Sequence, residues 1–412
     1  MTLGRPAVAP AFIPEERSPK LVGAVWMLLV INTLGSQGAV TIVPIPRSIT
    51  QLVTMGALAA AFVLALLLNP RVRLRPSAML LLLTLLTVVS VIGSAQMVSG
   101  YGAFFRCGRL ALFLATLWLL TPWWDDALRL ARHHIRAVGA VLATVAVGLV
   151  VAPGLAMPEF YSGRLVGAIW PMTPPQIGFY SATLIGLTVL LWLGGREPRS
   201  SLLIVAAPAL VLLLMSHTRT AMIAMVAALA VALVSLVSTS ARARKLFTRA
   251  TLVAGASAIF LGPFIQAWLR RGQDDESLSD LTGRQKVWDA LLAAPRTTSE
   301  QLFGVGLTNK SFGGLPIDSS WLAVYHEQGL IGVAIVVAFL VTMLIVGVLR
   351  PPSLERSAAL FLVIYCIVAS YTEAGLGDAS PYLLNLAIAA AFLHAASRAT
   401  DRQPENRPGV AA

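Results

Sequence analysis

Residues 330–349 read LIGVAIVVAFLVTMLIVGVL, a run of twenty residues without a charged side chain. A helix needs about 20 mostly apolar residues to cross the hydrocarbon core of a bilayer. In lipid, only helices and closed barrels satisfy every backbone hydrogen-bonding group. The run lacks the alternation of apolar and polar residues that marks a barrel strand, so it predicts a membrane-spanning helix.

The composition of the whole chain places the rest of it in the same class. Of the 412 residues, 57% are apolar and 12% are charged, and the mean hydropathy is +0.77. A soluble domain carries about 25% charged residues, so this chain has too little charge to cover a water-soluble surface. We therefore predict an all-α polytopic membrane protein.

The apolar runs predict about twelve transmembrane helices, with ten or eleven as alternatives because several runs are short. The predicted spans are 22–43, 50–69, 78–97, 108–123, 137–156, 177–194, 201–216, 221–238, 251–267, 321–349, 357–373 and 381–396. Cys107 and Cys366 lie near or within these runs, which favours buried thiols over a disulfide framework.

The formal net charge of +12 has two explanations, which are nucleic-acid binding and orientation in a membrane. The apolar composition favours the second, because Lys and Arg gather in cytoplasmic loops. With a cytoplasmic N-terminus, twenty of the 31 basic residues fall in inside segments. We expect no nucleic-acid partner, a cytoplasmic N-terminal arm (1–21) and a cytoplasmic C-terminal tail (397–412).

One predicted outer segment, 268–320, is much longer than the others. It separates spans one to nine (22–267) from spans ten to twelve (321–396) within a single membrane domain. Long loops are often functional. A short helix is expected within this loop from apolar residues at helical spacing, namely Val287, Trp288, Leu291 and Leu292.

Four short motifs flank or occupy this loop. They are 216–221 (SHTRTA), 283–288 (GRQKVW), 163–167 (GRLVG), and 318–319 (DS) followed after nine residues by GLIG. In order and spacing they resemble the O-antigen ligase and polymerase family, whose members carry S-x-S-R-T-A, G-R-x-x-x-W, R-L-x-G and H-N before G-x-x-G. The resemblance covers roughly residues 160–335.

The resemblance implies a bacterial enzyme of the cytoplasmic membrane that assembles cell-surface polysaccharide. Its donor would be a glycan on undecaprenyl diphosphate and its acceptor a hydroxyl of a second glycan. It implies no cofactor, and a chain-length regulator is a possible partner. Asp318 stands where the ligases have their histidine, so the resemblance favours a polymerase over a ligase.

Arginines suit the task of holding a diphosphate, since guanidinium stays charged and binds phosphate oxygens in a two-pronged geometry. The candidates are Arg219, Arg284 and Arg164. Arg219 lies at the start of a predicted span, where free N–H groups favour anions. The alternatives are a snorkelling Arg219 and solvated surface charges at the other two positions.

The acceptor hydroxyl needs a base, and Asp318 occupies the family's base position. Asp318 could instead be the N-cap of the following helix. His326 and Glu327 follow about two helical turns later; Glu327 is predicted to bind substrate, and His326 is expected on the same side as Asp318. It is either a base, a partner of Asp318 or a packed polar residue, and His217 is a further candidate.

The remaining charged residues predict less. Glu373 is expected to brace an arginine or to be solvated together with Asp378, and no acidic spacing matches a metal motif. Lys286 and Lys310 are expected to be surface charges. Two other functions stay open, a transporter or flippase and an envelope assembly scaffold, although the chain lacks the internal repeats common in transporters.

Overall fold

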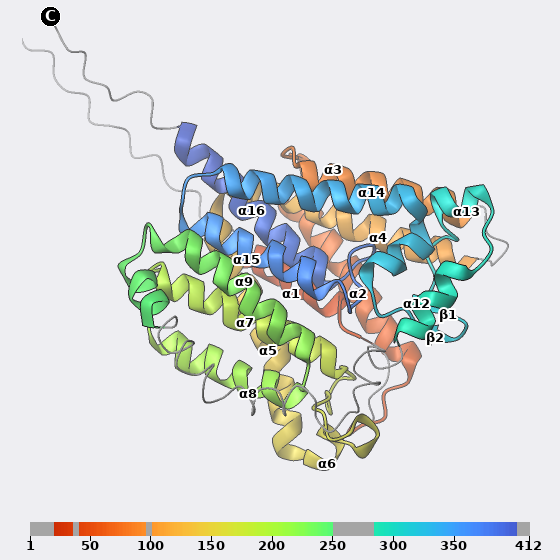
Figure 1. Cartoon of the computed structure of the whole chain (residues 1–412), viewed down its shortest axis with the longest axis horizontal. Coiled ribbons are helices and arrows are strands. Elements are labelled where there is room, and N and C mark those ends of the chain that lie inside the picture. Colours follow the sequence, from red (N-terminus) through yellow and green to blue (C-terminus); the bar gives the residue numbers. More distant parts are fainter. Residues whose placement is uncertain (1–19, 36–40, 96–100, 250–283, 402–412) are drawn as a thin grey trace, which may run out of the picture.

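The computed structural model describes residues 20–35, 41–95, 101–249 and 284–401 (Figure 1). The elements of its first half are α1 (Lys20–Asn32), α2 (Arg47–Leu68), α3 (Ala78–Ala95), α4 (Tyr101–Leu120), the 3-10 turn η1 (Thr121–Asp126), α5 (Ala127–Val151), α6 (Pro153–Ala156), η2 (Glu159–Tyr161), α7 (Pro174–Leu193), the π-helical turn η3 (Leu202–Ala206), α8 (Ala207–Ser216) and α9 (Arg219–Val237). A further stretch, 241–249, is helical.

The second half contains three long helices and a compact insert before them. The elements are α12 (Arg284–Ala293), α13 (Thr298–Phe303), the two-stranded antiparallel sheet of β1 (Ser311–Phe312) and β2 (Leu315–Pro316), α14 (Ser320–Leu349), α15 (Leu354–Ala369) and α16 (Pro381–Asp401). In Figure 1 the insert lies at the right-hand end of the helices, opposite the end of α16.

Six helical stretches within the described residues are long and apolar enough to cross a membrane. They are Arg47–Leu68, Ala78–Ala95, Tyr101–Val151, Pro174–Leu193, Arg219–Val237 and Ser320–Leu349. The third stretch contains both α4 and α5. The chain is therefore a helical protein with several membrane-length helices, whereas a count of twelve spans remains a prediction. The predicted ninth span, 251–267, lies outside the described residues.

Two helices have ends that differ from the predicted spans by about ten residues. Helix α1 stops at Asn32 rather than near residue 43, and the following chain carries Pro44 and Pro46 before α2 begins. Helix α5 begins at Ala127 rather than near 137. Hydropathy detected only the apolar part of α5, because the first turns of this helix carry Arg129, Arg132 and Arg136.

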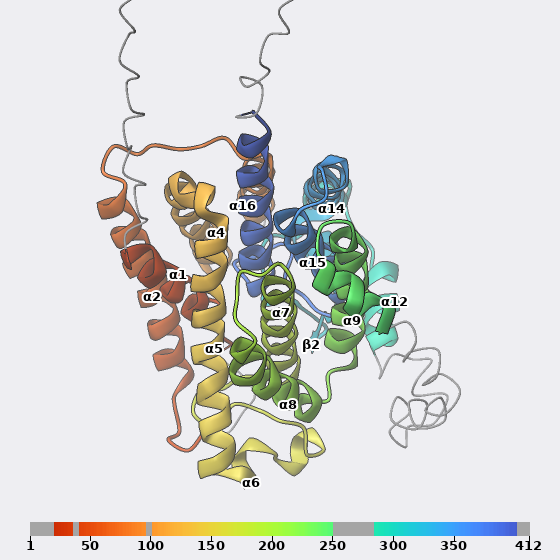
Figure 2. The ribbon, with the colours of Figure 1, turned by 90° about the vertical axis from the view of Figure 1, so that its left-hand side faces the viewer.

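Helix α7 is the centre of the bundle. It packs against α5, α8, α9 and α15 (Figure 2), and most of its residues are buried. A Cβ atom at Gly186 would meet the Phe361 ring at 1.9 Å, so glycine allows α15 this close approach. Small residues at helix contacts are common in membrane bundles, where van der Waals packing holds the helices together.

Helices α9 and α15 show the same use of small residues. The buried side of α9 includes four alanines at helical spacing, namely Ala221, Ala224, Ala228 and Ala232, and α15 is its main neighbour. Large apolar side chains such as Leu52 and Val226 point out of the bundle instead. An apolar exterior of this kind is the surface that a bilayer requires.

Hydrogen bonds join the starts of α9 and α14 to the loop between α15 and α16, at one end of the bundle. The side chain of Ser320, at the start of α14, donates to the Glu373 carbonyl after α15. The hydroxyl of Thr220, at the start of α9, bonds to that of Thr372. Arg109, in the first half of α4, donates to the Ala379 carbonyl before α16. We call this the site end, because all of the candidate residues below lie there.

Candidate functional site

Arg284 joins two carboxylates that come from different segments of the chain. It is the first residue of α12, and its Nε lies 3.2 Å from Oδ2 of Asp318, just before α14. Its Nη2 lies 3.8 Å from Oε1 of Glu373, in the loop between α15 and α16. We call Arg284, Asp318 and Glu373 the carboxylate–arginine cluster. It joins the second motif (283–288) and the fourth motif, which begins at Asp318.

Two contacts besides these ion pairs hold α12 in place. Trp288, the aromatic residue of the second motif, makes an edge-to-face contact with Tyr371 at a ring separation of 5.6 Å. Leu291 is buried together with Ile317 and Ala323. The apolar side of α12 therefore fixes the position from which Arg284 reaches the two carboxylates.

Arg164 links the first motif (216–221) and the third motif (163–167). Its Nε donates to the Ser216 carbonyl at 3.1 Å and its Nη2 to Oγ1 of Thr218 at 3.5 Å. Burial lowers the pKa of Arg164, with Glu373 acting in the opposite direction and the positive charges of Arg284 and Arg219 adding to the lowering. Arg164 is thus within electrostatic range of the carboxylate–arginine cluster.

Arg219 begins α9, directly after the N-cap residue Thr218. The next residue, Thr220, bonds to Thr372 at 2.6 Å between their hydroxyl oxygens. Because Thr372 precedes Glu373, this bond brings the start of α9 to the loop of the cluster. Of the three predicted arginines, Arg284 contacts Glu373 of this loop and Arg164 is within electrostatic range of Glu373. Arg219 follows Thr218 at the helix start that Thr220 joins to the loop.

Glu373 is in an unusual state for a carboxylic acid. Burial raises the pKa of Glu373 to about 7, against the lowering effect of Arg284, while Asp318 adds to the rise and Arg164 opposes it. Its side chain keeps 23% of its surface exposed. A partly accessible carboxyl group that ionises near neutral pH can accept or release a proton.

Ser320 holds the loop that carries Glu373. Its hydroxyl donates to the Glu373 carbonyl at 2.6 Å and accepts from the N–H groups of Gly375 and Leu376. The Ser320 N–H also donates to the Ser370 carbonyl. These bonds join the start of α14 to the α15–α16 loop, so that Asp318 and Glu373 both reach the Arg284 guanidinium.

The alternative in which Asp318 caps α14 is wrong. Ser319 is the N-cap residue and its side chain makes no capping bond. The Asp318 carboxylate instead pairs with Arg284. Sequence position alone did not reveal this pairing, because Arg284 lies on a different helix.

His326 and Glu327 face other partners than Asp318. His326 Nδ1 lies 3.1 Å from Nη2 of Arg296, and its ring contacts Phe312 edge-on. Glu327 Oε1 accepts three bonds, from the N–H and hydroxyl of Thr308 and from the N–H of Lys310. Both residues hold the insert against α14 in the structure. Their predicted roles in catalysis and substrate binding remain predictions.

His217 ends α8 in the left-handed conformation, with φ of 50°. It therefore forms the turn between α8 and α9 that sets Thr218 and Arg219 at the site end. Left-handed backbone is uncommon outside glycine, and Asn, Asp and His are the residues that adopt it most readily.

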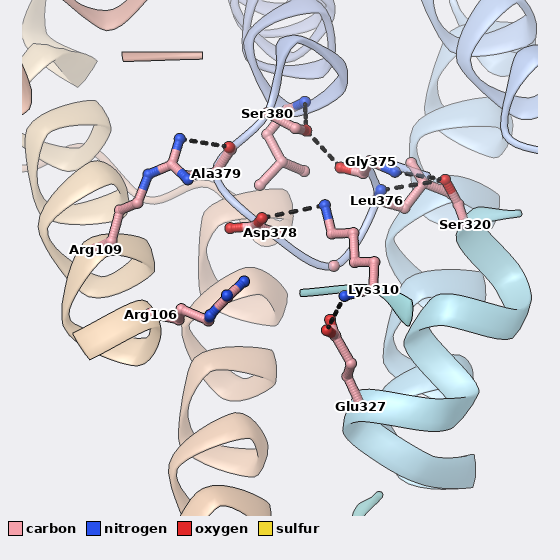
Figure 3. A network of polar contacts seen from close by, with 12 residues as sticks. Arg106, Arg109, Lys310, Ser320, Glu327, Gly375, Leu376, Asp378, Ala379 and Ser380 are labelled. Carbon is pink, nitrogen blue, oxygen red and sulfur yellow. Dashed lines mark hydrogen bonds and ion pairs between the residues drawn. The ribbon is translucent and has the colours of Figure 1, made fainter. Parts of the chain in front are cut away.

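A second polar network involves the same loop between α15 and α16, through Asp378 and Ala379 (Figure 3). Lys310 Nζ lies 3.1 Å from Oδ2 of Asp378, and the two side chains are 23% and 20% exposed. Neither is the solvated surface charge that the sequence predicted. Arg106 donates to the Thr308 carbonyl, and Arg109 donates to Asn32 and Ala379.

Sequence reasoning missed Arg106 and Arg109. Their spacing of three residues places both on one face of a helix, at the predicted outer side, and this was the available signal. Within the described ranges, no group of three or more His, Cys, Asp or Glu side chains could hold a metal ion. Comparison of the chain with family models and with curated proteins finds no match.

Proposed function

We propose that this protein is a membrane glycosyltransferase of the polymerase type. It transfers a glycan from undecaprenyl diphosphate to a hydroxyl of an acceptor glycan during the assembly of a cell-surface polysaccharide. The observation that supports the proposal best is the contact of Arg284 with two carboxylates at one end of an apolar bundle. Arg164 is within electrostatic range of Glu373, Arg284 and Arg219. The motif resemblance supplies the substrate class.

In the proposed reaction, the acceptor oxygen bonds to the anomeric carbon while the bond from that carbon to the diphosphate oxygen breaks. The acceptor proton passes to a carboxylate, and the lipid diphosphate leaves as an anion. The three arginines neutralise the charge that grows on the leaving diphosphate, a task for which fixed cations near a low-dielectric region are suited. Direct displacement inverts the anomeric carbon.

The ion pairs of Arg284 with two carboxylates suggest that, in the proposed reaction, donor binding precedes proton transfer. Asp318 and Glu373 both contact Arg284, and a diphosphate would compete with them for the same guanidinium. Once the donor occupies Arg284, the two carboxylates lose part of their counter-charge and become stronger bases. The proposal therefore couples donor binding to activation of the Asp318–Glu373 pair as proton acceptor.

A cell-free assay with lipid-linked repeat units tests the proposal. We expect Arg219→Gln, Arg284→Gln and Asp318→Asn each to lower the rate of chain joining roughly 100-fold, by analogy with the loss of one transition-state contact. Lys286→Gln removes the same charge from an exposed position of α12 and should leave the rate unchanged. Wild-type rates in all three site variants would refute the assignment, and lipid movement between leaflets without bond formation would indicate a flippase.

A further inference from the structure

An apolar groove of about 510 Å³ lies between the last turns of α2 and α4 and the first turn of α3. All of its lining residues are hydrophobic, and they include Phe62 and Leu66 of α2, Leu81 of α3 and Trp118 of α4. Leu66 and Leu81 are 41% and 58% exposed, so the groove opens to the outer surface of the bundle. In a bilayer, hydrocarbon chains cover an apolar surface of this kind.

The connection between α2 and α3 carries positive charge to one end of this groove. Val72 and Leu74 line the groove, and Arg71 and Arg73 alternate with them along the chain. Both arginines are exposed. Figure 2 shows this connection at the end of the bundle opposite α6. Two cations therefore follow directly after the apolar part of α2, beside a groove that extends along it.

Asn69 fixes the conformation of this connection. Its buried side chain accepts from the Arg73 N–H at 2.8 Å and donates to the carbonyls of Arg73 at 2.7 Å and Leu119 at 3.1 Å. Between Asn69 and Arg73 the chain turns at Val72, whose φ is 45°. Because a positive φ is strained for a β-branched residue, the bonds of Asn69 stabilise the turn and tie it to α4.

The charges of Arg71 and Arg73 are not neutralised by the carboxylates that surround them in the fold. Three carboxylates at this end of the bundle have other partners, in the pairs Arg75–Asp125, Arg129–Asp126 and Arg132–Glu197. Within the part of the chain that the structure describes, Arg71 and Arg73 form no ion pair. The groove and its two arginines together complement a ligand with a hydrocarbon chain and an anionic head.

We infer that an anionic phospholipid of the bilayer binds here, with an acyl chain in the groove and its phosphate on Arg71 and Arg73. Charge complementarity selects this occupant over a zwitterionic phospholipid, whose ammonium group would face the same two cations. The site end contacts Arg109 in the first half of α4, whereas the groove adjoins the last turns of that helix. This phospholipid is therefore distinct from the proposed donor, and its binding does not depend on the proposed reaction.

Quenching of Trp118 fluorescence by brominated acyl chains tests which phospholipid occupies the groove. Trp118 lines the groove, and its indole N–H donates to Oγ1 of Thr84 at 3.1 Å. The signal of Trp118 is the difference between the full chain and its Trp118→Phe variant, both reconstituted in brominated phosphatidylcholine. Added phosphatidylglycerol without bromine should restore the fluorescence, with a roughly tenfold preference over phosphatidylcholine because two arginines attract its phosphate.

Two pairs of substitutions separate this local site from the overall positive charge of the protein. Arg71→Gln/Arg73→Gln should lower the preference for phosphatidylglycerol to about 1, since the cations beside the groove are lost. Arg196→Gln/Arg199→Gln removes the same number of charges from exposed positions between α7 and η3 and should keep the preference of wild type. Thermal unfolding of each variant shows whether the fold is intact.

A wild-type preference of about 1 would overturn the inference. Equal losses in the two double variants would also overturn it, because they would indicate attraction to net charge rather than to this groove. A third contrary result is a dimeric chain in which no brominated phospholipid quenches Trp118. That result would assign the groove to a second copy of the chain instead of a phospholipid.

Discussion

At the scale of single residues, the carboxylate–arginine cluster shows how one guanidinium organises a site. Arg284 contacts Asp318 and Glu373 at once, and the two like charges are tolerated because one of them is protonated over part of the pH range. Burial raises the pKa of Glu373 to about 7. Below that pH Glu373 is mainly a neutral acid, and above it Glu373 is a base.

This state of Glu373 predicts the pH dependence of the reaction. At donor concentrations well below KM, the rate of chain joining reports the free protein and should rise as pH increases through about 7, because only the ionised carboxylate accepts a proton. Glu373→Gln should lower the rate and remove this inflection. The measurement is the initial rate between about pH 5 and 9 with lipid-linked repeat units. An unchanged inflection in Glu373→Gln would assign it to another group.

At the scale of elements, the insert and α14 meet at a crossing of two glycines. Helix α14 is interrupted at Gly329, whose φ is 68°, and Gly304 ends α13 with φ of 75°. The carbonyls of His326 and Glu327 accept from the N–H groups of Val305 and Gly306. The insert thus supplies donors at the break in α14, which keeps buried backbone groups paired.

The crossing leaves no room for a side chain. A Cβ atom at Gly329 would meet the Leu302 carbonyl oxygen at 2.3 Å, and the left-handed backbone would be strained as well. Gly329→Ala should therefore destabilise the fold by about 1–3 kcal/mol, as overpacking does. Thermal unfolding in detergent, followed by tryptophan fluorescence, measures the change.

Gly56→Ala is the matched control for this substitution. Gly56 lies within α2 and a Cβ atom there meets nothing within 4 Å, so alanine should leave the unfolding midpoint equal or higher, since it favours helix. An unfolding midpoint of Gly329→Ala equal to that of wild type would contradict the close crossing.

At the scale of the whole molecule, the two ends of the bundle differ in what their charges do. The site end holds the carboxylate–arginine cluster and a cavity lined in part by Arg47, Arg106 and Arg109, here called the arginine-lined cavity. At the other end, Arg132 pairs with Glu197 at 2.8 Å and Arg75 with Asp125. The predicted orientation puts this second end in the cytoplasm, where basic residues of membrane proteins concentrate.

The orientation can be measured with two engineered cysteines. Leu315 in β2 and Leu74 between α2 and α3 are 56% and 51% exposed, while Cys107 and Cys366 are buried. We expect Leu315→Cys to react with a membrane-impermeant maleimide in intact cells. Leu74→Cys should react only after permeabilisation. The opposite pattern would invert the orientation and place the site end in the cytoplasm.

Much of this protein follows from local sequence. Hydropathy alone predicted a helical membrane protein, because an apolar helix of about 20 residues matches the thickness of the hydrocarbon core of a bilayer. The resemblance of four short motifs to a known family selected Arg164, Arg219, Arg284 and Asp318 as candidates. Apolar residues at helical spacing predicted the helix that contains Trp288, since this spacing depends only on neighbours in the chain.

Only the tertiary structure decided which of these residues meet. The partner of Asp318 is Arg284 on another helix, and Glu373 reaches both of them through a loop held by Ser320. The arginine-lined cavity likewise combines α2, α4 and the insert. Such contacts depend on how helices far apart in the chain pack, and no periodicity within a single segment encodes that arrangement.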